Sequence, residues 1–253
     1  MKLFLDTADV EAIRRANDTG LLDGITTNPM KIAETGKPFY GVIEEICSIV
    51  AGPVSAEAVA QRAEDMVREA EKLAAIAPNV VNKVPMNVEG LKAAAILEQE
   101  KDIRVNVTMV FSADQALLAM KTGATFVSIV LSRLDKIGSD SDILVDDTVT
   151  VKENYGFASE VLAASLKTRN HVLSCLRYGA DIISVPESLF FEMFHHPLTD
   201  QAQAGFDEIW SKVRKCERLS RWEAWKVGSW EVRRLGSWEV MRLQYRETWR
   251  LND

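Results

Sequence analysis

A lysine lies inside a short apolar segment with the sequence Val80-Val81-Asn82-Lys83-Val84-Pro85-Met86. A run of this length, rich in β-branched residues and closed by a proline, predicts a buried strand. Side chains alternate along a strand, so Lys83 and Asn82 point to opposite faces. Burial disfavours the charged form of an amine, and a neutral amine is the nucleophile of Schiff-base chemistry. The alternative is a lysine whose stem is buried while its ammonium group reaches solvent or a carboxylate.

Similar strand-like segments alternate with helix-like segments along the chain. Apolar residues recur at helical spacing in 60–76, 88–99 and 113–121. The expected strands are 2–6, 24–28, 53–58, 80–85, 104–109, 126–131, 160–165 and 182–186. About eight βα units predict a (β/α)8 TIM barrel, with a doubly wound open sheet as the alternative. No glycine-rich dinucleotide fingerprint follows the first strand, which weakens the open-sheet interpretation.

The sequence divides into a long body and a tail of different composition. We expect residues 1–216 to form the barrel together with a final helix at roughly 199–215, which opens at Thr199-Asp200 after Pro197. One side of that helix carries apolar residues that cover either the core or a partner subunit, namely Phe206, Ile209, Trp210 and Val213.

Residues 217–253 form the tail, which contains five of the six tryptophans. It carries two copies of Gly-Ser-Trp-Glu-Val, at 228–232 and 236–240, which is fewer than the three or so repeats that a solenoid needs. Alternation around Leu235-Gly236 permits a small hairpin, but a hairpin alone is marginal in water. We therefore expect a loosely held or disordered extension without a catalytic role.

Composition and charge limit the class of protein. The chain has 253 residues, 47% of them apolar, and its formal net charge of −7 argues against general binding to nucleic acid or to anionic membranes. No apolar run approaches the roughly 18 residues that span a bilayer, and the first residues lack the apolar core of a signal peptide. Three widely spaced cysteines (Cys47, Cys175 and Cys216) suggest neither a disulfide framework nor a zinc site. We expect a soluble, cytoplasmic protein.

Polar side chains recur near the C-terminal ends of the expected strands, where barrel enzymes carry out their chemistry. The expected catalytic residues are Asp6, Glu57, Lys83 and Thr108, and the expected substrate-binding residues are Thr26, Asn28, Asn106, Ser128, Arg133, Ser165 and Lys167. Any one of them can be a satisfied core group or a strand-end cap. Because buried polar groups need partners, so many of them together predict a shared polar pocket.

The residue types suggest a division of roles within this pocket. Lys83 can form an iminium, while Asp6 and Glu57 can move protons directly or through a water held by Thr108. Asn28 and Asn106 can hold substrate hydroxyls. A phosphate group suits the basic and hydroxyl side chains of the late strands, namely Arg133, Ser165 and Lys167. No metal is expected, because the histidines lie away from the pocket strands, at His171, His195 and His196.

Short motifs occur in order over about residues 1–215. They are Phe4-Leu5-Asp6-Thr7-Ala8, Gly24-Ile25-Thr26-Thr27-Asn28-Pro29, Asn82-Lys83-Val84-Pro85, Asn106-Val107-Thr108, Arg133-Leu134-Asp135, Ala164-Ser165-Leu166-Lys167 and His196-Pro197-Leu198-Thr199-Asp200. Together these motifs are highly specific, and through them the chain resembles the small-subunit transaldolase family, which includes the fructose-6-phosphate aldolases.

This resemblance implies a (β/α)8 barrel, cofactor-free class I aldol chemistry and ring-shaped homo-oligomers, usually pentamers or decamers. It also implies the role of each site residue. The Schiff-base lysine falls on Lys83, the acid/base of C–C cleavage on Asp6, the water-holding pair on Glu57 and Thr108, and the phosphate site on Arg133, Ser165 and Lys167.

The chain departs from the family pattern at a few positions. Transaldolases of this type usually read Ser-Pro-Phe before the strand-six arginine and the aldolases read Pro-Tyr, whereas this chain reads Ser128-Ile129-Val130. Met30 replaces a usual serine, Asn82 stands where an apolar residue is expected, and the tail has no family counterpart. These differences bear on specificity more than on the chemistry.

We expect a transaldolase that transfers a dihydroxyacetone unit from a ketose phosphate to an aldose phosphate. Glu57 is the residue that transferases of the family carry where the aldolases usually carry glutamine. One alternative is a fructose-6-phosphate aldolase that releases free dihydroxyacetone. An alternative of another class is a binding barrel without turnover, with the Trp-rich tail as its contact surface, and the complete set of Lys83, Asp6 and Glu57 argues against it.

Overall fold

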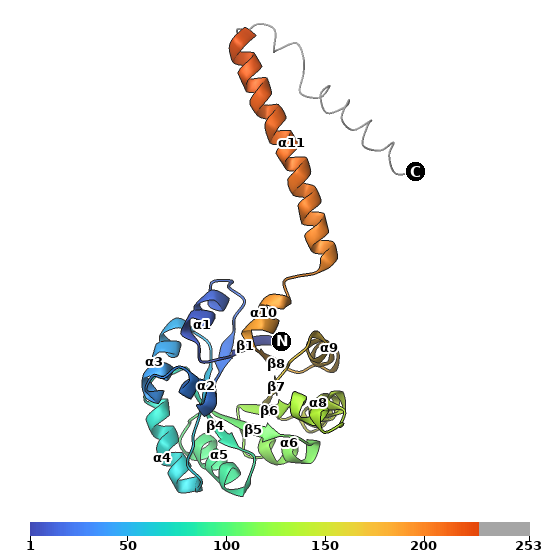
Figure 1. Cartoon of the computed structure of the whole chain (residues 1–253). Coiled ribbons are helices and arrows are strands. Elements are labelled where there is room, and N and C mark those ends of the chain that lie inside the picture. Colours follow the sequence, from blue (N-terminus) through green and yellow to red (C-terminus); the bar gives the residue numbers. More distant parts are fainter. Residues whose placement is uncertain (228–253) are drawn as a thin grey trace. The chain divides into compact units, whose positions relative to one another are not determined.

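Eight parallel strands close into a barrel in the computed structural model of the chain (Figure 1). The structure describes the backbone of residues 1–227 and the side chains of residues 1–214. The strands are β1 (Lys2–Asp6), β2 (Gly24–Thr26), β3 (Val54–Glu57), β4 (Val80–Pro85), β5 (Val105–Val110), β6 (Phe126–Val130), β7 (Glu160–Ala164) and β8 (Ile182–Val185). Because β1 pairs with β8 as well as with β2, the sheet has no free edge. The predicted (β/α)8 barrel is confirmed, and the open-sheet alternative is wrong.

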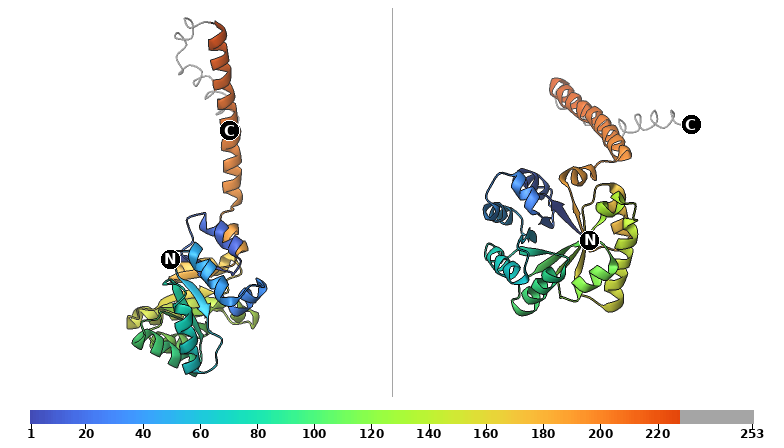
Figure 2. Two further views of the ribbon diagram at one scale, coloured as in Figure 1. Left: turned by 90° about the vertical axis from the view of Figure 1, so that its left-hand side faces the viewer. Right: turned by 60° about the horizontal axis from the view of Figure 1, so that its bottom comes forward.

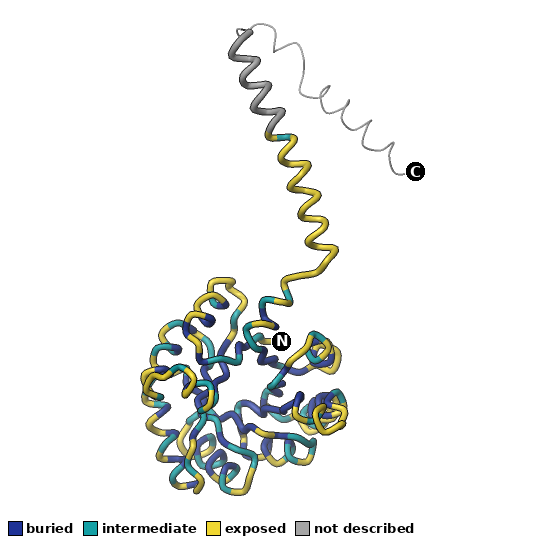
Figure 3. The backbone as a smooth tube through the Cα atoms, in the orientation of Figure 1, coloured by how far each residue is buried: buried dark blue, intermediate teal, exposed yellow. Residues whose placement is uncertain are grey.

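Helices between the strands form the outer layer of the barrel, as the right-hand view of Figure 2 shows. They are α1 (Val10–Asn17), α2 (Pro29–Glu34), α3 (Phe39–Ile49), α4 (Ala63–Ala74), α5 (Val88–Glu100), α6 (Ala113–Met120), α7 (Leu131–Lys136), α8 (Ser141–Tyr155), α9 (Arg169–Tyr178) and α10 (Glu187–Glu192). In α4 the apolar residues Met66, Val67, Ala70 and Leu73 recur at helical spacing and are buried. Buried residues accordingly follow the strands and the helix faces toward them (Figure 3).

The barrel interior is apolar at one end and polar at the other. Near the start of their strands, five interior residues form a separate buried cluster, namely Phe4, Val81, Phe126, Leu162 and Ile182. The rings of Phe4 and Phe126 meet edge to face, with centroids 5.9 Å apart. Side chains alternate along a strand, so the next interior positions lie two residues further on, at Asp6, Lys83, Ser128, Ala164 and Ser184. The interior therefore becomes polar toward the C-terminal ends of the strands.

The C-terminal helix α11 (Pro197–Val227) is longer than the sequence indicates. It begins at Pro197, whose fixed φ suits the first helical position, and it continues past the expected end at residue 215. Contacts divide the chain into a unit Met1–Phe194 and a second unit that begins at His195. The expected loosely held extension begins at residue 217, but its first residues, 217–227, are helical and belong to α11. Both copies of Gly-Ser-Trp-Glu-Val, with the expected hairpin and the rest of the expected extension, lie outside the described residues. Among the helices that the structure describes, none is long and apolar enough to cross a membrane.

Candidate active site

A cavity of about 350 Å³ lies at the C-terminal ends of the strands. Its walls come from seven of the predicted strands and the segments that follow them, and they consist of Asp6, Thr26, Asn28, Pro29, Met30, Glu57, Lys83, Thr108, Met109, Ser128, Val130, Arg133, Ala164 and Ser165. All of the predicted catalytic residues line this cavity. Among the predicted substrate-binding residues, Asn106 and Lys167 do not line it.

Lys83 and Glu57 form an ion pair at the centre of the site. The parallel register of β3 and β4 places these residues opposite each other, and Lys83 Nζ lies 2.8 Å from Glu57 Oε2. Lys83 Nζ also donates a hydrogen bond to the Thr27 carbonyl oxygen at 3.1 Å. The two side chains are only 12% and 18% exposed. Glu57 and the Thr27 carbonyl oxygen thus fix the position of Lys83 Nζ at the cavity wall.

Asp6 ends β1 with both carboxylate oxygens in contact with neighbours. Thr26 Oγ1 donates to Oδ1 at 3.2 Å and itself lies 2.6 Å from Ser184 Oγ. Lys31 Nζ lies 3.1 Å from Oδ2. Sequence reasoning missed Ser184 and Lys31. Helical position offers a signal for Lys31, because Asn28-Pro29 marks a helix start and places residue 31 in the first turn beside the strand ends.

Asn106 lies beneath the cavity and supports its floor. It is fully buried, donates from Nδ2 to Ser55 Oγ at 3.1 Å, and accepts at Oδ1 from Ser128 Oγ at 2.6 Å. Asn28 has a structural task as well, because its Oδ1 accepts a hydrogen bond from the Lys31 backbone N at 3.0 Å and so caps α2. The predicted asparagines therefore lie at different depths.

The predicted phosphate-binding residues gather at the ends of β6 and β7. Arg133 lies in α7 and is exposed at the cavity wall. Ser165 has a left-handed backbone, with φ 60°, and its Oγ lies 2.7 Å from Ser132 Oγ. Lys167 is exposed outside the cavity wall, and its backbone N donates to His171 Nδ1 at 3.0 Å.

Apolar side chains also line the cavity, some of them beside these polar groups on β6 and β7. Met30 is 71% exposed, and Met109 has a left-handed backbone with φ 63° at a register irregularity between β5 and β6. Val130 and Ala164 complete the apolar part of the wall. Within residues 1–214, no group of three His, Cys, Asp or Glu side chains is arranged to hold a metal ion.

Fold and cavity together define a (β/α)8 barrel with a lysine and two carboxylates, Lys83, Glu57 and Asp6, in one cavity at the C-terminal ends of its strands. A family model described as "Transaldolase/Fructose-6-phosphate aldolase" matches residues 3–227, and the chain belongs to this family. The family expectation drawn from the sequence motifs is therefore confirmed.

Several similar proteins are described as probable transaldolases. The chain is 49% identical over 215 residues to a "Probable transaldolase" of Geobacter metallireducens, a match that covers 85% of this chain and 100% of that protein. It is 51% identical over 215 residues to a "Probable transaldolase" of Clostridium tetani, with the same coverage. A "Probable transaldolase 2" of Listeria monocytogenes is 50% identical over 217 residues, 86% of this chain and 99% of that protein.

A solved structure supports the fold alone. The thiamine phosphate pyrophosphorylase of Pyrococcus furiosus superimposes with a TM-score of 0.54 over 75% of this chain and 87% of that one. Only 15% of the aligned residues are identical, so this similarity concerns the barrel and carries no conclusion about substrates.

Proposed function

We propose that the protein is a transaldolase that moves a dihydroxyacetone unit between sugar phosphates. The reaction converts sedoheptulose 7-phosphate and glyceraldehyde 3-phosphate into erythrose 4-phosphate and fructose 6-phosphate. The observation that supports it best is the Lys83–Glu57 ion pair, which is largely shielded from solvent and shares one cavity with Asp6 in a chain of this family.

The first half of the reaction uses Lys83 and Glu57. Lys83 transfers a proton to Glu57 and attacks the ketose carbonyl carbon, and loss of water from the adduct gives an iminium. Asp6 then accepts the proton of the C4 hydroxyl while the C3–C4 bond breaks, and its electron pair forms an enamine on Lys83. The aldose leaves as an aldehyde. Thr108, on β5 and in the same cavity wall as Lys83, holds the water that leaves and later returns.

The second half runs the same steps in reverse with a new aldehyde. The enamine carbon attacks the acceptor carbonyl, Asp6 returns its proton to the new hydroxyl, and water releases the ketose from Lys83. Arg133 and Ser165 hold the substrate phosphate, which suits charge-assisted hydrogen bonds. Lys167 lies outside the cavity wall on the segment after β7 that also carries Ser165, and its positive charge assists phosphate binding.

Transfer competes with release of free dihydroxyacetone, and the cavity wall favours transfer. Glu57 stands where transferases of the family carry glutamate and the aldolases usually carry glutamine. Val130, buried at the end of β6, offers no hydroxyl that would deliver water to the enamine. The enamine then waits for an aldehyde rather than a proton.

The test follows the fate of fructose 6-phosphate with and without erythrose 4-phosphate. We expect little free dihydroxyacetone from the donor alone, and rapid donor consumption with formation of sedoheptulose 7-phosphate once the acceptor is added. Dihydroxyacetone that accumulates at a similar rate in both mixtures identifies a fructose-6-phosphate aldolase and contradicts the proposal.

We also propose that the protein assembles into a homopentamer or homodecamer. Helix α11 supports this assembly, because its apolar residues Phe206, Ile209 and Trp210 are 67%, 60% and 54% exposed. A second copy that covers them removes a large apolar surface from water. Native mass determination checks the assembly, and a monomer at micromolar concentration contradicts it.

The working compartment is proposed to be the cytoplasm. Cys47 and Cys175 are free thiols, as a reducing compartment allows. Burial raises the pKa of the Cys47 thiol to about 11, and burial with help from Asp142 raises that of Cys175 to about 12. Both thiols therefore stay protonated and unreactive at neutral pH.

A further inference from the structure

A second lysine contacts the carboxylate of Asp6. Lys31 belongs to α2, and its Nζ lies 3.1 Å from Asp6 Oδ2 and donates to the Asp6 carbonyl oxygen at 2.5 Å. The two side chains are 26% and 19% exposed, so the pair is largely shielded from water. None of the roles in the reaction described above requires this lysine.

Lys31 is held at both ends. Its backbone N donates to Asn28 Oδ1 at 3.0 Å, while its ammonium group binds Asp6. On the other side of the carboxylate, Thr26 donates to Oδ1 and contacts Ser184. Both oxygens of Asp6 are thus bound by groups from different elements, and this fixes the plane of the carboxylate.

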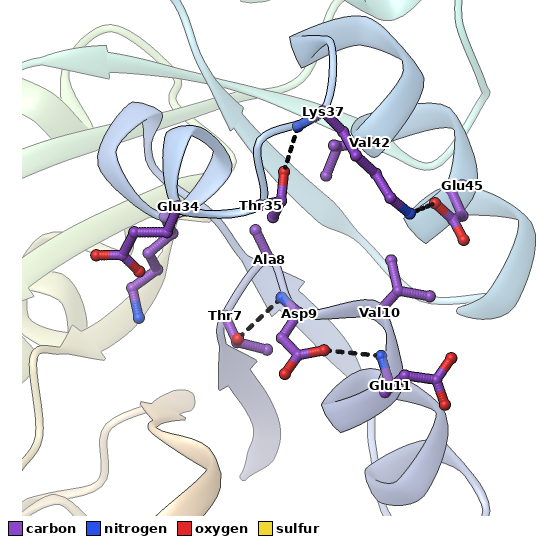
Figure 4. Close-up of a pocket in the computed structure, with 11 residues that line it drawn as sticks. Thr7, Ala8, Asp9, Val10, Glu11, Glu34, Thr35, Lys37, Val42 and Glu45 are labelled. Atoms are coloured by element: carbon purple, nitrogen blue, oxygen red, sulfur yellow. Dashed lines mark hydrogen bonds and ion pairs between the residues drawn. The ribbon is translucent and has the colours of Figure 1, made fainter.

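The ion pair lies between two cavities. Asp6 lines the active-site cavity, whereas Lys31 lines a separate cavity of about 450 Å³ beside the end of β1. Figure 4 shows this outer cavity, with Thr7, Ala8 and Asp9 on one side and the Lys37–Glu45 ion pair on another. Lys31 is therefore placed to act through Asp6 and not on a substrate.

We propose that Lys31 is a positioning residue that holds the Asp6 carboxylate in the orientation needed for C–C bond cleavage and formation. The inference rests on the roles proposed for Asp6 and Lys83. It separates two steps: Schiff-base formation on Lys83 proceeds without Lys31, and the proton transfer at the C4 hydroxyl depends on it. A displacement of about 1 Å in such a group costs on the order of 100-fold in rate.

The experiment compares K31M, K31R and the control K37M. Lys37 lines the same outer cavity and also pairs with a carboxylate, Glu45 at 2.8 Å. It matches Lys31 in charge and in having a carboxylate partner, it is more exposed, and its partner is not Asp6. We expect K31M to lower kcat for transfer by about 10- to 100-fold with KM nearly unchanged. We expect K31R to recover most of the rate, since a guanidinium also binds a carboxylate, and K37M to match the unsubstituted protein.

Borohydride trapping separates positioning from general damage. Dihydroxyacetone forms its Schiff base without C–C cleavage, so all variants should yield the adduct on the peptide that contains Lys83 at the unsubstituted rate. Adding K31M to D6N should cost no further activity, because the carboxylate that Lys31 holds is gone.

Several outcomes overturn the inference. An unchanged kcat in K31M, a full additional loss in the D6N background, or a K31M variant that is folded yet fails to trap dihydroxyacetone excludes the positioning role. No trapping in the unsubstituted protein overturns the Schiff-base function itself, and trapping in every variant with normal K31M turnover overturns only the role of Lys31.

Discussion

Each face of β4 carries a polar side chain with little exposure to solvent, and the two side chains differ in whether they have hydrogen-bond partners. On the inner face, Lys83 is paired with Glu57 at 2.8 Å and donates to the Thr27 carbonyl. On the outer face, Asn82 is fully buried, and neither its Nδ2 nor its Oδ1 has a hydrogen-bond partner among the described residues. Adjacent residues of one strand therefore differ in whether their burial is compensated.

The difference arises from what each face meets. The inner face above Val81 opens into the polar layer that several strands share, so Lys83 finds a carboxylate. The outer face packs against α4 and α5, and its other residues, Val80 and Val84, belong to the apolar cluster of these helices. An unpaired amide in such a place costs about 1–3 kcal/mol of stability. Position across the strand thus decides whether a polar residue becomes part of a site or a cost to the fold.

The largest effect is expected when the inner face is made apolar like the outer one. K83M removes the nucleophile and should lower transfer activity by at least about 1,000-fold, as loss of a covalent nucleophile does in other enzymes. Borohydride with fructose 6-phosphate should fix a sugar adduct on the Val80–Met86 peptide of the unsubstituted protein and none on the variant. The control is K152M, which breaks another partly buried ion pair, Lys152–Asp181. An adduct on a different lysine contradicts the assignment.

A smaller effect is expected from loss of Arg133, at the wall of the active-site cavity. Arg133 supplies charge-assisted hydrogen bonds to phosphate worth about 1.5–3 kcal/mol, so R133A should raise KM for phosphorylated sugars by roughly 10- to 150-fold. Steady-state kinetics with unphosphorylated donors should show little change. Lys136, an exposed basic residue of the same helix outside the cavity wall, gives the control K136A. Equal losses on both kinds of substrate indicate a structural role.

The smallest effect is expected on the outer face. N82V replaces the unpaired amide by an apolar side chain suited to a strand, and it should raise the free energy of unfolding by about 1–2 kcal/mol. Denaturant unfolding measures this, and kcat should not change. V84N, on the same face, should lower stability instead. A loss of stability in N82V shows that Asn82 has a partner in solution, and the contrast between the two faces then fails.

Local sequence signals predicted the strands well, and the departures have physical reasons. The expected strand 24–28 ends at Thr26, because Asn28 takes the capping position of α2 and Pro29 begins the helix. The final helix was expected to end near residue 215, yet nothing in the following sequence stops it before Val227. Boundaries depend on caps and breakers, which periodicity alone does not locate.

The candidate site was predictable to the level of which strand ends face the cavity. Alternation placed Lys83 and Asn82 on opposite faces, and the polar strand ends indicated the pocket that Asp6 and Glu57 now line. Sequence reasoning also predicted that Asn106 binds substrate, and this role stays a prediction, since the structure places Asn106 beneath the wall.

The sequence by itself determined the barrel, the family and the faces of each strand, because these follow from patterns within a few residues. Only the tertiary structure decided the partners: Glu57 for Lys83, Lys31 for Asp6, and no described partner for Asn82. These contacts join residues distant in the sequence, and they depend on strand register and on closure of β1 against β8. Periodicity fixes the direction of a side chain, but the atoms it meets are set by how the closed sheet and its helices pack together.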